Sequence, residues 1–130
     1  MKSLPTKRAK FFAVVFALYT VLAAVLFFSP RVPVPNIPEE IAPDKIAHVV
    51  LHIIFSYLFF KMRDAQNIRK KDILLELFFL GIMVSVFTEE IQGFIPGREK
   101  SWLDTLANLI GFFSFITFSA FVNRGVAKQK

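Results

Sequence analysis

The chain has 130 residues, enough for one domain and no more. Apolar residues make up 55% of it, and this share is too high for an ordinary soluble domain of this size. Cysteine is absent, which excludes disulfides, thiolate metal sites and cysteine nucleophiles. The sequence therefore predicts one all-α membrane domain over residues 1–130, a bundle of four transmembrane helices at about 11–28, 45–62, 73–92 and 102–122.

The net charge of +6 comes from basic residues that gather in alternate loops. They precede the first apolar run, separate the second from the third and follow the fourth, and the exceptions are Arg31, Lys45, Arg98 and Lys100. Cytoplasmic loops of membrane proteins carry an excess of Lys and Arg. This distribution predicts a multi-pass protein with both termini in the cytoplasm, and we expect no nucleic-acid partner.

The first apolar run, residues 11–28, contains no charge and would form about 27 Å of helix, enough to cross the hydrocarbon core. A basic flank before an apolar run is also typical of a signal peptide. This run is longer than the apolar region of a usual signal peptide, and no clear small-x-small cleavage site follows, so we interpret it as a retained span. Residues 29–43 hold five of the seven prolines and predict an extended connector on the outer surface.

The second span opens after Pro43 with Asp44, which is well placed as an N-cap. Within the span His48, His52 and Ser56 recur every four residues, so they share one stripe of the helix. His52 lies deeper than His48, and we interpret it as a buried, hydrogen-bonded histidine.

The third span carries Glu76 near its inner end, where water or neighbouring basic residues are within reach. Glu89 and Gln92 lie on one face at its outer end, and Gly93 is a plausible C-cap. The sequence 96–97, Pro-Gly, predicts a tight turn immediately afterwards.

The fourth span begins with Ser101, and Asp104 three residues later gives the pattern of a capping box. Asp104, Asn108 and Gly111 then form a stripe of polar and small residues. Such stripes let helices approach one another closely in lipid.

Polar residues from three spans should meet at one end of the bundle. With both termini inside, the second and fourth spans begin at the outer face and the third ends there. Polar side chains at a membrane boundary are costly unless they meet one another, water, headgroups or a ligand. We therefore expect the functional site among Asp44, Lys45, His48, Glu89, Gln92, Arg98, Asp104 and Asn108.

Three interpretations of this polar layer remain open. It is a network that only holds the helices together, with Arg98 bridging Glu89 and Asp104. Alternatively, Lys45, Arg98 and two helix N-termini bind an anionic phosphate or diphosphate headgroup. In the third, His48, Glu89 and Asp104 form a catalytic or metal centre. No local metal signature such as HExxH is present, and we expect neither a metal nor a cofactor.

Four motifs resemble those of the VanZ-like membrane proteins. They are DKIAH at 44–48, EEIQ at 89–92, PGR at 96–98 and DTLANLIG at 104–111, which resemble the DKxxH, ExxQ, pGR and DxxxNxxG elements of that family in order and spacing. The resemblance covers residues 44–121. It implies a multi-pass protein of the bacterial cytoplasmic (inner) membrane, in a family named for a protein that lowers susceptibility to the glycopeptide teicoplanin. It leaves the biochemical activity undefined.

We therefore expect a polar site at the outer face that binds or acts on a lipid-linked, phosphorylated or glycopeptide-related envelope component. The candidate catalytic residues are His48, Glu89 and Asp104, and the candidate binding residues are Asp44, Lys45, Gln92, Arg98 and Asn108. Lys45 and Arg98 would hold the anion. The alternative is a non-enzymatic membrane protein whose polar layer only stabilises the bundle. A transporter ranks third, because four spans are few for transport.

Overall fold

The structure, a computed structural model, describes residues 6–29 and 43–127. It contains four helices, α1 (Lys7–Phe28), α2 (Pro43–Ala65), α3 (Lys70–Gln92) and α4 (Trp102–Ala127). Each helix contains the apolar run expected for it, so the all-α prediction is confirmed. The predicted proline-rich connector lies outside the described residues, except for its two ends at positions 29 and 43.

Three of the described helices, α1, α2 and α4, are long and apolar enough to cross a membrane. Helix α3 has a comparable length of 23 residues, but charged residues lie near both of its ends. It nevertheless exposes large apolar side chains along its length, including Phe78, Phe79 and Phe87. The chain is thus an all-helical protein in which at least three helices are suited to lipid.

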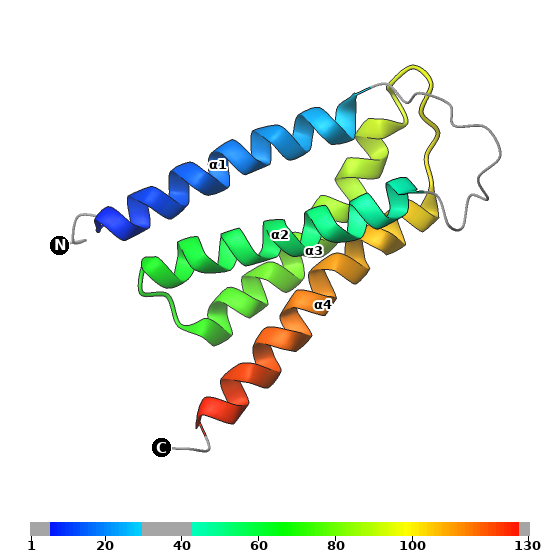
Figure 1. The fold of residues 1–130 in the computed structure, drawn as a ribbon. Coiled ribbons are helices and arrows are strands. Elements are labelled where there is room, and N and C mark those ends of the chain that lie inside the picture. The colour runs from blue at the N-terminus through cyan, green and yellow to red at the C-terminus, as the bar shows by residue number, and fades with distance from the viewer. Residues whose placement is uncertain (1–5, 30–42, 128–130) are drawn as a thin grey trace.

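Helices α2, α3 and α4 pack together, and α1 lies mainly against α2 (Figure 1). α2 contacts each of the other three helices, and α4 packs extensively against both α2 and α3. The C-termini of α1 and α3 and the N-termini of α2 and α4 lie at one end of the molecule, at the upper right in Figure 1. We call this the polar end, because it collects the polar residues singled out in the sequence.

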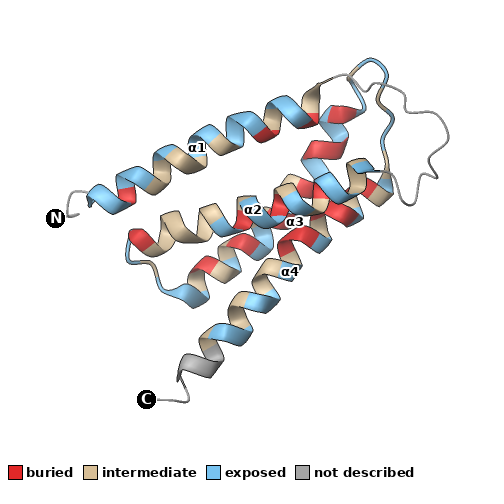
Figure 2. Ribbon diagram, viewed as in Figure 1, coloured by how far each residue is buried: buried red, intermediate tan, exposed pale blue. Residues whose placement is uncertain are grey.

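The buried residues are spread over all four helices (Figure 2). Many of them are polar, whereas many large apolar residues are exposed. The small hydrophobic core consists of Ile73, Leu77 and Phe112, away from the polar end. Among the described residues, the buried polar side chains are His48, His52, Ser56, Ser85, Thr88, Glu89, Gln92, Asp104 and Asn108. This inverted distribution is expected where the surrounding solvent is lipid, because polar groups in membrane helices face the bundle interior.

The start of α2 differs from the sequence-based expectation. The helix begins at Pro43, so Asp44 lies in its first turn, and the prediction that Asp44 is the N-cap is wrong. Proline suits the first helical position because its φ is already helical and its missing N–H has no intrahelical partner there. The Asp44 carboxylate still lies at the positive end of the helix dipole, where a negative charge is favourable.

The connection between α3 and α4 follows the prediction. Gly93 is the C-cap of α3, and its N–H donates to the carbonyl of Glu89. A tight turn follows, in which the N–H of Arg98 donates to the carbonyl of Ile95 at 3.1 Å. Gly97 has φ 79°, a left-handed conformation that glycine adopts without steric cost.

Helix α4 approaches α2 closely at Gly111. A Cβ added to this residue would lie 2.6 Å from the carbonyl oxygen of Val49 and 2.7 Å from the Cβ of His52. The predicted close approach of helices at this glycine is therefore confirmed. At the other end of the bundle the Glu76 carboxylate accepts from Arg63 Nε at 2.7 Å, so Glu76 has the basic partner that its position suggested.

Candidate functional site

Residues of α2 and α4 pair across the polar end. The Nζ of Lys45 lies 3.0 Å from Oδ1 of Asp104, and one turn deeper Nδ1 of His48 lies 2.7 Å from Oδ1 of Asn108. His48 and Asp104 are 3% and 2% exposed, and Asn108 is fully buried. The predicted stripes on the two helices therefore face one another in register.

The tautomer of His48 follows from its partner. The amide oxygen of Asn108 can only accept, so Nδ1 of the imidazole donates this hydrogen bond. In the neutral ring the lone pair then belongs to Nε2, which lies 4.0 Å from Oδ2 of Asp104. The ring of Phe27 packs beside the imidazole at 4.8 Å between centroids, which shields it from water. The imidazole and the carboxylate thus share an enclosed space suited to a proton or a cation.

Asp44 adds a second carboxylate to this space. It precedes His48 by one helical turn and is half-buried. One ligand atom from each of Asp44, His48 and Asp104 lies within 4.8 Å of the others. Within the described part of the chain, these are the residues that could hold a metal ion.

Glu89 joins the end of α3 to the start of α4. Its Oε2 accepts from the backbone N–H of Ser101 at 3.1 Å, and its side chain is buried. The first N–H groups of a helix have no intrahelical acceptor, so a carboxylate there is both a hydrogen-bond partner and a favourable charge. In the capping box expected from the sequence, Asp104 would fill this role, whereas the structure gives it to Glu89.

Gln92 and Arg98 bind the end of α1. Nε2 of Gln92 donates to the carbonyl of Phe27 at 2.8 Å. Nε of Arg98 donates to the carbonyl of Ser29 at 2.9 Å, and Nη2 donates to the carbonyl of Leu26 at 3.3 Å. The last carbonyls of a helix lack intrahelical donors, so these two side chains cap α1. Sequence reasoning missed this role, although topology already places the unpaired carbonyls of α1 at the same end.

The charges of the polar end are mixed. Among the predicted site residues, three carboxylates, those of Asp44, Glu89 and Asp104, lie there with the cations of Lys45 and Arg98. Lys45 is ion-paired with Asp104, so a phosphate would compete with that carboxylate for the ammonium group. The structure therefore gives each predicted cation a protein acceptor.

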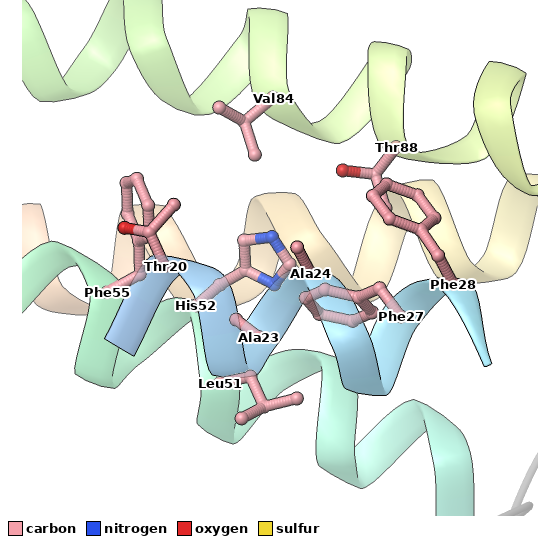
Figure 3. A pocket seen from close by; sticks show the side chains of 10 residues that line it. All are labelled: Thr20, Ala23, Ala24, Phe27, Phe28, Leu51, His52, Phe55, Val84 and Thr88. Atoms are coloured by element: carbon pink, nitrogen blue, oxygen red, sulfur yellow. The ribbon is translucent and has the colours of Figure 1, made fainter. Parts of the chain in front are cut away.

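An apolar cavity of about 200 Å³ lies between α1, α2 and α3, near the polar end (Figure 3). Ala23, Ala24 and Phe27 line it from α1, and His52 and Phe55 line it from α2. His52 is almost fully buried, as expected from the sequence, and its Nδ1 donates to the carbonyl of His48 at 2.8 Å. The cavity is thus separated from the polar cluster by one helical turn.

No protein-family model matches this chain, and no solved structure matches it. The chain is 27% identical over 97 residues to an uncharacterized protein of Schizosaccharomyces pombe. The matched segment is 75% of this chain and 55% of the yeast protein, so the chain spans about half the length of that relative. Since the relative is eukaryotic, the bacterial location and the VanZ-like resemblance stay predictions.

Proposed function

We propose that this protein is a four-span membrane protein of the VanZ-like kind, with both termini in the cytoplasm, that binds a lipid-linked phosphate. The phosphorylated headgroup lies at the polar end and part of the hydrocarbon chain lies in the apolar cavity. The observation that carries this proposal is the position of the cavity, which shares His52 and Phe27 with the surroundings of the buried polar cluster.

The size of the cavity favours a lipid chain over a compact ligand. Pockets for small molecules usually measure roughly 300–1,000 Å³, and this cavity of about 200 Å³ is smaller. Its lining is almost wholly apolar, with polar groups contributed by Thr20, His52 and Thr88. A segment of one acyl or isoprenoid chain fits such a space, while the rest of the lipid remains in the membrane.

The four-span arrangement draws support from α3. Its 23 residues correspond to roughly 34 Å of helix, which is long enough to cross the hydrocarbon core. The charged residues near its ends would lie at the headgroup level, and Glu76 is paired with Arg63. Four spans place both termini on one side, where the basic flanks favour the cytoplasm.

The residues of the polar end divide into two groups under this proposal. Glu89, Gln92 and Arg98 connect helix ends, so their contribution is to hold the site together. His48 and Asp104 form the pair available for proton transfer to or from a bound headgroup. Binding without reaction is the second candidate function, favoured because so many of the predicted site residues make helix-capping contacts.

Filling the cavity tests the proposal. Ala24→Phe places an aromatic ring where the lipid chain would lie, and Val21→Phe, on a 63% exposed position of the same helix, is the matched control. The purified protein in nanodiscs is titrated with a polyprenyl phosphate, with the corresponding polyprenyl alcohol and with phosphatidylglycerol.

We expect saturable binding of the polyprenyl phosphate, at least tenfold weaker binding of the alcohol, and loss of binding in Ala24→Phe but not in Val21→Phe. Preferred binding of phosphatidylglycerol would identify a bulk phospholipid as the ligand. A product formed from the bound lipid would identify an enzyme. Equal binding by Ala24→Phe and the wild type would refute the role of the cavity.

A further inference from the structure

We infer that Asp44, His48 and Asp104 form a binding site for one divalent transition-metal ion, Zn²⁺ or Mn²⁺. Sequence reasoning expected no metal, and its metal alternative contained Glu89 in place of Asp44. The structure instead engages Glu89 at the start of α4 and brings one ligand atom from each of Asp44, His48 and Asp104 within 4.8 Å of the others.

The separation of the two buried ligands suits a metal. Zinc binds imidazole nitrogen and carboxylate oxygen at about 2.0–2.2 Å, and Nε2 of His48 lies 4.0 Å from Oδ2 of Asp104. In a tetrahedral site two such ligand atoms lie about 3.4 Å apart, so binding both requires a closure of about half an ångström, which is small enough for the two side chains to supply without a rearrangement of the helices. Asp44 lies in the first turn of α2, and one of its carboxylate oxygens is already within 4.8 Å of the ligand atoms of His48 and Asp104.

Asn108 prepares the histidine for this role. Metal-binding histidines almost always donate their second ring N–H to an acceptor, which fixes the tautomer and the ring orientation. Nδ1 of His48 donates to the fully buried Oδ1 of Asn108, so Nε2 is the nitrogen directed toward Asp104.

Lys45 leaves room for the ion. Its ammonium group is paired with Oδ1 of Asp104, whereas Oδ2 is the oxygen nearer to His48. One imidazole and two carboxylates are ligands that Zn²⁺ and Mn²⁺ both accept. Three protein ligands also leave a coordination position open.

The open position connects the metal to the lipid, and this step alone rests on the proposed function. A phosphate beside the carboxylates of Asp44 and Asp104 would be repelled, whereas a bound dication reverses the local charge. The phosphate oxygen of a lipid headgroup would then bind the ion directly. The metal site itself requires no lipid.

The test measures binding of the metal ion in the absence of lipid. Full-length protein is purified in detergent, stripped with a chelator and titrated with Zn²⁺ by calorimetry and with Mn²⁺ by electron paramagnetic resonance. We expect one ion per chain and at least tenfold weaker binding in His48→Gln, Asp44→Asn and Asp104→Asn. Glu90→Gln is the matched control, because Glu90 is a carboxylate at the same end of the bundle that pairs with Lys100 and lies outside the ligand group, and this variant should bind as the wild type does.

If Asp104→Asn fails to fold, two other results still decide the question. They are the affinity of Asp44→Asn and the spectrum of the bound ion. The wild type should show coupling of Mn²⁺ to one imidazole nitrogen, and His48→Gln should lose it. Absence of saturable binding, or binding unchanged in both Asp44→Asn and His48→Gln, would overturn the inference. If metal binding fails while polyprenyl phosphate still binds, the proposed function stands without the metal. If the metal binds and polyprenyl phosphate does not, the metal site stands and the proposed function fails.

Discussion

Replacing Gly111 by alanine should separate α2 from α4. The new Cβ would lie 2.6 Å from the carbonyl oxygen of Val49 and 2.7 Å from the Cβ of His52, whereas ordinary van der Waals contacts begin at 3.4 Å. The first of these atoms belongs to a helix backbone and cannot rotate away. The two helices must therefore move apart by most of an ångström.

The expected cost combines two opposing effects. Overpacking of a close contact costs typically 1–3 kcal/mol, and collision with backbone places Gly111→Ala at the upper end of that range. Replacing glycine by alanine inside a helix stabilises the helix by about 1 kcal/mol, because alanine has the higher helix propensity. We therefore expect the free energy of unfolding to fall by about 2 kcal/mol. The contact between His48 and Asn108 lies one turn away on the same interface, so metal affinity should fall as well.

Gly93→Ala is the matched control for this substitution. Its added Cβ would also lie 2.6 Å from the nearest atom, but that atom is a side-chain carbon of Lys100, which is exposed and can swing aside. We expect a change below about 0.5 kcal/mol, as for most exposed substitutions.

Unfolding in mixed micelles with increasing dodecyl sulfate measures both variants. The single tryptophan, Trp102 at the start of α4, reports on the polar end by fluorescence, and circular dichroism reports on the helices. Equal stability of Gly111→Ala and the wild type, or an equal loss in Gly93→Ala, would show that α2 and α4 are not in close contact at Gly111.

Two further predictions concern topology and the attachment of α1. Because the chain lacks cysteine, single cysteines can be placed at Gln66 and at Glu99, both exposed. A membrane-impermeant thiol reagent should label position 99 in intact cells and position 66 only after permeabilisation, and labelling of both or of 66 alone would contradict the proposed topology. Gln92→Leu removes the donor to Phe27 and leaves that carbonyl buried without it, which should lower stability by roughly 1–3 kcal/mol. Gln92→Glu, which cannot donate in its ionised form, should cost at least as much in the same assay, and no loss in either variant would contradict the capping role.

The pairing of α2 with α4 follows from spacing that the sequence displays. Lys45 with His48, and Asp104 with Asn108, each lie about one turn apart near a helix start, so helices with a common end bring them together. Periodicity and the shared helix ends were therefore enough to predict that these residues meet. The same reasoning located Gly111 as a point of close approach.

The roles of Arg98 and Gln92 could not be predicted in the same way. Both were expected to face the site, but they cap α1, whose rotation and depth no sequence pattern specifies. Helix α1 is apolar on all sides, so it has no stripe that indicates its buried face. For the same reason the cavity between α1 and its neighbours was not foreseen.

The contacts between α2 and α4 at the polar end have a consequence for axial register. Two apolar helices in lipid gain little from one vertical alignment over another, because hydrocarbon tails are as apolar as their own side chains. Sliding α4 by one turn would move Asp104 away from Lys45 and Asn108 away from His48, and would leave buried polar groups to find other partners. The polar pairs thus specify a single axial alignment of the two helices, much as a buried asparagine specifies the register of a coiled coil.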